Sequence, residues 1–196
     1  MKALTLRNPW SWAIAHAGKN VENRDWSDDL ARLNNAHRLP GERIAIHGGS
    51  APERPRGKKH WRELAPTNLW RQHCEDLEGL HRILGGELPD TAAQFLAARC
   101  PDGVLKPEHF ICPGIVAVAT VQRVTRTCQS RWAAQGALHI ELTEVITLPR
   151  PVQCSGKQGL WDLGFDLEEL VQERLLEWSV QQIPADTGRT AEEWLL

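Results

Sequence analysis

The run GIVAVATVQRV at residues 114–124 limits the choice of fold more than any other stretch of this chain. It is rich in β-branched residues and far too short to span a membrane, so it predicts a strand buried inside a sheet. Four other stretches also contain β-forming residues and predict further strands: 2–7, 20–26, 42–47 and 137–148. We therefore expect the chain to be organised around a β-sheet.

Turn and cap residues mark where these strands give way to other elements. Asn8 is a suitable N-cap residue and Pro9 suits the first position of a helix. We expect that helix to end at Gly18, because glycine readily takes a left-handed conformation. Pro149 and Pro151 interrupt the last long strand pattern, so this strand is expected to stop before them, and residues 156–161 lead into a last short extended piece.

The middle of the chain, residues 51–112, lacks the β pattern. We interpret it as a helical insertion between strands of one domain that spans 1–182, and we expect 183–196 to form a tail. The predicted helices are 61–84 and 90–99 within the insertion and, after a cap at Asp166, an amphipathic C-terminal helix over 166–182. The fold class predicted from these patterns is α+β.

Composition excludes several function classes. Hydrophobic residues make up 41% and charged residues 24%, which is ordinary for a globular protein, and no apolar run reaches the length of a membrane span. The start MKALTLRNPW does not resemble a signal peptide, so we expect a cytoplasmic protein without a membrane partner. The five cysteines form no Cys-x-x-Cys pair, and we expect reduced thiols, no metal and no cofactor.

Charge is unevenly distributed although the net charge is only −2. Five of the nine residues at 54–62 are Lys or Arg, whereas the stretch from Gly164 to the end holds eight acidic residues and two basic ones. A near-neutral total therefore conceals a basic segment. The sequence leaves open whether 54–62 contacts phosphate at the mouth of a cleft or is a solvated loop.

The segment GKNVENR at 18–24 concentrates ionisable groups where a helix gives way to a strand. Alternation along a strand places Glu22 and Arg24 on one face, with Trp26 continuing the row, and Lys19 just precedes them. Glu22 is expected to pair with one of the two cations and to leave the other for an external anion such as phosphate. A structural salt-bridge network on a sheet face is the alternative interpretation.

Four stretches, taken in order, resemble the ASCH family of the PUA-like superfamily. They are the opening KALTLRNPWSWAIAHAGKNVENRDW, the strand ERIAIHGG, the strand GIVAVATV and the closing PRPVQCSGKQGLWDL. They cover most of the chain apart from the helical insertion and the C-terminal helix. The resemblance implies a small mixed β-barrel.

The resemblance also implies a polar cleft in this barrel. Lys19, Glu22 and Arg24 would line it, with Gln158 and Trp161 contributed by the closing segment. Asn8 stands where many members have Gln, which keeps the amide but shortens its reach.

Other candidate residues near this cleft have two interpretations each. Trp26 is suited to stacking on a base or to filling the core, and His47 to acting as a base or to a structural hydrogen bond. Lys157, beside Gln158, is a candidate phosphate contact.

Three hypotheses for function follow. The first is binding of RNA or DNA, or of a nucleotide or nucleoside, through the cleft. The second is a small hydrolase with Lys19 and Glu22 as catalytic residues, because some ASCH proteins are amidohydrolases on acetylated cytidine nucleosides and others have been proposed as ribonucleases. The amidohydrolase branch has Thr where this chain has Glu22, which argues against that reaction. The third hypothesis is a protein-interaction domain.

Overall fold

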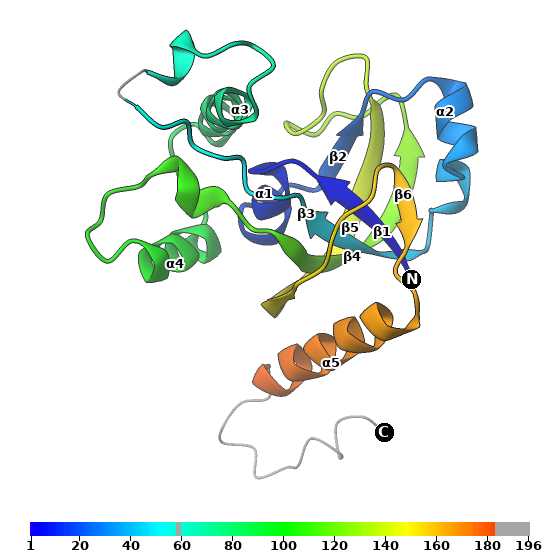
Figure 1. Cartoon of the computed structure of the whole chain (residues 1–196). Coiled ribbons are helices and arrows are strands. Elements are labelled where there is room, and N and C mark those ends of the chain that lie inside the picture. The colour runs from blue at the N-terminus through cyan, green and yellow to red at the C-terminus, as the bar shows by residue number, and fades with distance from the viewer. Residues whose placement is uncertain (58–59, 183–196) are drawn as a thin grey trace.

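A curled six-stranded mixed sheet forms the centre of the molecule, and together with its helices it gives an α+β fold (Figure 1). The computed structural model describes residues 1–57 and 60–182. The strands lie in the order β2-β5-β4-β3-β1-β6. Their bounds are β1 Lys2–Leu6, β2 Val21–Arg24, β3 Arg43–Gly48, β4 Gly114–Thr125, β5 Leu138–Val152 and β6 Leu160–Asp162. The curl makes the sheet a half-barrel, which is consistent with the small mixed β-barrel that the resemblance implies.

The curl of the sheet brings the edge strand β2 close to β1. β1 and β3 are parallel, whereas the other neighbouring strands are antiparallel. The edge strand β2 pairs only with β5 in the described part of the chain. Nevertheless Arg24 at its end donates a hydrogen bond of 2.8 Å from Nη2 to the carbonyl of Thr5 in β1. This contact links two strands that are not neighbours in the sheet.

Helices cover both faces of the sheet, and this explains the continuous apolar run in β4. The helices in the described residues are α1 Trp10–His16, α2 Asp28–Leu33, α3 Leu69–Leu84, α4 Asp90–Arg99 and α5 Phe165–Gln181, with short 3-10 turns at Ala36–Arg38, Trp61–Glu63 and Pro107–Phe110. Val116 and Ala117 belong to the core that contains α1, whereas Ile115 and Val118 belong to the core that contains α5. A strand with two buried faces has little room for polar residues.

The helical insertion leaves and rejoins the sheet between β3 and β4, which are antiparallel neighbours. α4 begins and ends at the predicted residues, whereas α3 begins at Leu69, later than predicted. Trp12 of α1 joins the insertion to the sheet: its ring centroid lies 4.8 Å from that of Phe110 and 6.5 Å from that of Phe95. Trp12 is fully buried at this contact.

Three local predictions were wrong. Asn8 does not cap α1, which has Pro9 at its N-cap and no side-chain cap, because the Asn8 amide bonds elsewhere. Asp166 lies inside the first turn of α5, after Gly164. β5 continues through Pro149 and Pro151, where its pairing with β4 is irregular and prolines are tolerated.

Two further expectations concern the tail and a membrane span. The tail predicted at 183–196 lies outside them. Among the helices that the structure describes, none is long and apolar enough to cross a lipid bilayer.

Candidate functional site

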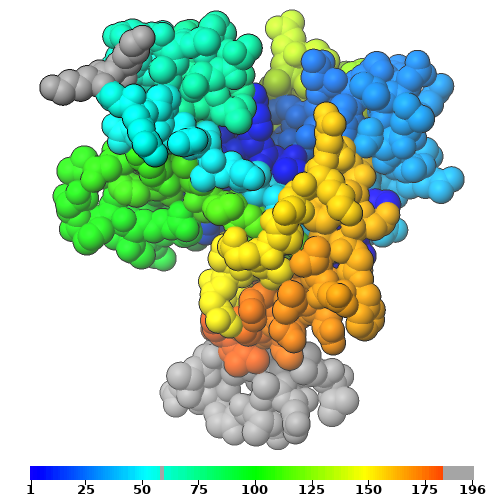
Figure 2. Space-filling view, in the orientation of Figure 1, coloured from blue at the N-terminus to red at the C-terminus, as the bar shows by residue number. Residues whose placement is uncertain are grey.

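A pocket of about 420 Å³ lies where the barrel and the helical insertion meet. It is lined by side chains from within 5–8, 49–52, 69–76 and 156–159, together with Arg24. Figure 2 shows the N-terminal residues, in dark blue, recessed between the insertion in cyan to green and the closing segment in yellow. Five separate parts of the chain therefore contribute to one hollow.

Lys19 lies behind this pocket and is not among the residues that line it. Gly18 has a φ of 68° and turns the chain at the end of α1, as predicted. The Lys19 side chain is only 2% exposed, and its Nζ donates to the Val21 carbonyl and to Glu22 Oε2, the latter over 3.2 Å. Burial lowers the pKa of Lys19, and the Glu22 carboxylate opposes that shift.

Glu22 binds both cations and so leaves neither wholly free. Its Oε2 contacts Lys19 and its Oε1 lies 3.2 Å from Arg24 Nε. The prediction that the three residues gather was therefore confirmed, whereas the expectation that Glu22 pairs with only one cation was wrong. Buried carboxylates attract every available cation because desolvation makes an unpaired charge costly.

Arg24 is the member of the trio that reaches the pocket. Its Nη2 donates to the Thr5 carbonyl, and its Nε forms an ion pair with Glu22 without the geometry of a hydrogen bond. Among the described residues, no protein group accepts a hydrogen bond from Nη1. The orientation of the Arg24 guanidinium is thus fixed, while its Nη1 remains available to donate to a ligand.

Trp26 lies outside the pocket, contrary to the predicted polar row. β2 ends at Arg24, so alternation does not extend to residue 26. The Trp26 ring is half-buried against the core and its centroid lies 5.6 Å from Arg24 Cζ. Trp26 therefore packs beside Arg24 rather than along a continuing strand.

His47 and Trp161 support the pocket from behind without lining it. His47 Nε2 lies 3.2 Å from the Cys154 carbonyl, and burial lowers the pKa of this histidine, so the ring is neutral near pH 7 and donates from Nε2. Trp161 Nε1 donates to Thr5 Oγ1 over 3.1 Å, and its ring meets His47 edge-on. A Cβ on Gly156 would lie 2.6 Å from His47 Cε1, so only glycine lets this segment approach so closely.

Gly156 thereby brings Lys157 and Gln158 to the pocket, where both are lining residues. Lys157 Nζ lies 5.6 Å from the Trp161 ring centroid. Its ammonium makes no hydrogen bond or ion pair among the described residues, so it contributes positive charge that no carboxylate contacts directly.

Asn8 also lines the pocket, and its amide is bound to three groups of the protein. Nδ2 donates to the Gly49 carbonyl over 2.9 Å, and Oδ1 accepts from Cys112 N at 3.0 Å and from Ser11 Oγ at 3.3 Å. Asn8 therefore fastens both ends of the helical insertion to the turn before α1. Its role is to hold the pocket wall in place.

The wall formed by α3 was missed by sequence reasoning. Arg7 donates from Nη1 to Gln72 Oε1 over 3.2 Å, and its Nη2 lies 3.4 Å from Asp76 Oδ2. Burial raises the pKa of Asp76, and the Arg7 charge opposes that shift. The only signal in the sequence was the i, i+4 spacing of Gln72 and Asp76 on one helix face. Nothing local links that face to residue 7.

No metal centre can be built from the described residues, because none of their His, Cys, Asp and Glu side chains gather in groups of three or more. The buried Cys100 and the half-buried His109 have an Sγ–Nδ1 distance of 2.6 Å, but the described residues supply no third ligand. Comparisons with protein-family models and with curated proteins found no match.

Proposed function

We propose that this protein binds nucleic acid by receiving one unpaired nucleotide in the pocket between the barrel and the helical insertion. The observation that carries the proposal is the Arg24 guanidinium, fixed by Glu22 and Thr5 at the wall of a pocket of about 420 Å³. Cavities of this size are typical of small-ligand sites. The resemblance to the ASCH family and its PUA-like barrel supports the same conclusion.

The charges around the pocket favour an anionic ligand. Arg24, Arg7 and Lys157 supply three cations, and among the described lining residues the one carboxylate is Asp76, already beside Arg7. An oriented arginine fork matches two phosphate oxygens or the acceptor edge of a base. The amide of Gln158 adds a donor and an acceptor for a base edge.

The hydrolase hypothesis has weaker support in the geometry. Lys19 and Glu22 contact each other, and burial lowers the pKa of Lys19, as a catalytic lysine requires. However, Lys19 is directed at Val21 and Glu22 and does not line the pocket. We therefore assign the pair to positioning Arg24, and we expect binding of modified nucleosides or RNA without turnover.

The test is binding of fluorescein-labelled single-stranded RNA and DNA, measured by anisotropy at several salt concentrations. We expect salt-sensitive binding that Arg24→Gln weakens by about tenfold or more, and that Lys157→Gln weakens with a salt slope reduced by about one. Lys157→Gln is informative because this side chain has no structural hydrogen bond among the described residues.

Arg150→Gln is the matched control. Arg150 is an exposed arginine of β5 that pairs with Glu177, away from the pocket lining. Absence of salt-sensitive binding by the wild type, or equal weakening by Arg150→Gln, would contradict the proposal. Turnover of an acetylated cytidine nucleoside or of RNA that is lost in Lys19→Ala would favour the hydrolase instead.

A further inference from the structure

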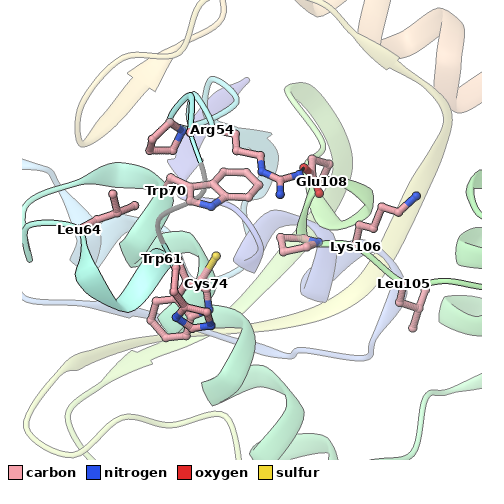
Figure 3. Close-up of a pocket in the computed structure, with 12 residues that line it drawn as sticks. Arg54, Trp61, Leu64, Trp70, Cys74, Leu105, Lys106 and Glu108 are labelled. Carbon is pink, nitrogen blue, oxygen red and sulfur yellow. Dashed lines mark hydrogen bonds and ion pairs between the residues drawn. The ribbon is translucent and has the colours of Figure 1, made fainter.

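A second pocket, of about 460 Å³, lies wholly within the helical insertion (Figure 3). Two indoles, Trp61 and Trp70, and the thiol of Cys74 form its inner part. Arg54 and Glu108 meet at the rim, and Lys106 lines it with its ammonium directed away from the indoles. The Cys74 thiol is neutral, because burial raises its pKa to about 11. The interior is therefore aromatic and uncharged, whereas the rim is ionic.

Each indole in this pocket has an arginine beside its ring. Arg62 Cζ lies 4.3 Å from the Trp61 centroid and Arg54 Cζ lies 5.9 Å from the Trp70 centroid. Trp70 is nearly buried, whereas Trp61 is half-buried and also borders an adjoining hollow of about 580 Å³. Trp61 is thus the aromatic surface that a ligand reaches more easily.

The cations at the rim are held only in exposed ion pairs. Glu108 accepts from Arg54 over 3.0 Å, and Lys106 Nζ lies 3.3 Å from Asp102 Oδ2. Exposed pairs of this kind contribute little to stability, so a phosphate can replace either carboxylate at little cost. An aromatic site for a quaternary ammonium would instead need carboxylates without paired cations. A planar ring attached to phosphate matches both the indoles and the cations.

The two pockets flank the same part of α3. Leu69 and His73 line the first pocket, and the next residues along the helix, Trp70 and Cys74, line the second. Successive residues of a helix point about 100° apart on a cylinder roughly 10–12 Å across. The pockets are therefore separated by little more than one helix, a span that a strand of a few nucleotides covers.

We infer that the second pocket is a subsite for another base of the same single strand, stacked on Trp61, with Arg54 and Lys106 contacting the neighbouring phosphate. This inference rests on the proposed function and adds to it that the ligand is an oligonucleotide rather than a mononucleotide.

The test compares labelled oligouridylates of one, two, four and eight nucleotides by anisotropy. We expect wild-type affinity to rise with length, and Trp61→Ala to remove about tenfold or more of the affinity for the octamer while leaving the mononucleotide unchanged. Trp61→Phe, which keeps a stacking ring, should retain most of the gain. Trp178→Ala, at a half-buried tryptophan of α5, is the matched control.

The outcomes separate the two proposals. Binding that depends on Arg24 but is equal for mononucleotide and octamer, or an octamer affinity that Trp61→Ala and Trp178→Ala leave alike, would overturn the second subsite and preserve the first. Absence of binding by the wild type at every length would overturn both. Photocrosslinking of an octamer containing 4-thiouridine supplies a second measurement, since it should label a peptide containing Trp61.

Discussion

The barrel and the helical insertion hold their charges in different ways. On the barrel side, Lys19 and Glu22 are buried and pair with each other, and Glu22 also holds Arg24. On the insertion side the ion pairs are exposed, as between Arg62 and Glu78, whose side chains are 58% and 50% exposed. The barrel wall therefore presents a fixed donor, whereas side chains of the insertion are free to rearrange around a ligand.

This contrast follows from the cost of removing charge from water. A buried pair is stable only while all its partners are present, and loss of one partner typically costs about 3–5 kcal/mol. An exposed pair contributes about 0–1 kcal/mol, because water solvates either charge nearly as well. The predictions below test whether the barrel and the insertion differ to this extent and whether they unfold together.

The largest effect is expected for Trp12→Ala, which removes the contact between the two regions. Trp12 is fully buried against Phe95 and Phe110, so its truncation should lower the free energy of unfolding by about 3–5 kcal/mol, with a further loss from the aromatic pairs. Urea denaturation followed by circular dichroism measures this. Phe165→Ala, at a side chain 80% exposed, is the control and should change stability by less than about 0.5 kcal/mol.

Glu22→Ala should follow closely, with a loss of about 3–5 kcal/mol, since it leaves the Lys19 ammonium buried without a carboxylate. Adding Lys19→Met to this variant should recover much of the loss, because the uncompensated charge is then removed. Urea midpoints of the single and double variants provide the measurement. A double variant no more stable than Glu22→Ala would show that the barrel wall is not held by this pair.

Acid should weaken the contact between α1 and the helical insertion, with a smaller loss of stability. Burial, and secondarily the Arg99 charge, lower the pKa of His16 from 6.5 to about 4, and its ring stacks on Phe95 at 3.8 Å. The unfolded chain binds this proton more readily, so stability should be lost as pH falls from about 6.5 to about 4 and not further below. The slope from one such group is at most about 1.4 kcal/mol per pH unit, and less for a ring that is partly solvated.

This pH dependence is measured as the urea midpoint across that range. His16→Gln should flatten it, and His47→Gln should do so as well, because burial also lowers the pKa of His47. If stability falls equally steeply with pH in the wild type and in His16→Gln, His16 does not cause the acid sensitivity of this contact.

The smallest effect is expected for Glu78→Gln, which removes the carboxylate paired with Arg62. Both side chains are exposed, so the free energy of unfolding should fall by less than about 1 kcal/mol. Thermal unfolding measures the change. A loss of stability comparable to that of Glu22→Ala would remove the contrast between the barrel and the insertion.

Sequence reasoning succeeded where a local pattern decides the structure. The β-branched run predicted β4, and the spacing of GKNVENR predicted that Lys19, Glu22 and Arg24 lie together, although not that Glu22 pairs with both cations. It failed where a side chain has a distant partner: the caps expected at Asn8 and Asp166 did not form, and the α3 wall was not foreseen. Membership of the ASCH family and nucleic-acid binding stay predictions.

The Asn8 amide has a consequence for how much the insertion can vary. It fastens Gly49 and Cys112 to one point, so the insertion begins and ends at the same place on the barrel. Once the ends of a loop are held together, doubling its length costs only about 0.6 kcal/mol in chain entropy. Residues can therefore be added to the outer part of the helical insertion with little loss in the free energy of folding. Arg24 on the barrel would stay in place, while a longer insertion on the opposite side of the pocket could bind a different ligand.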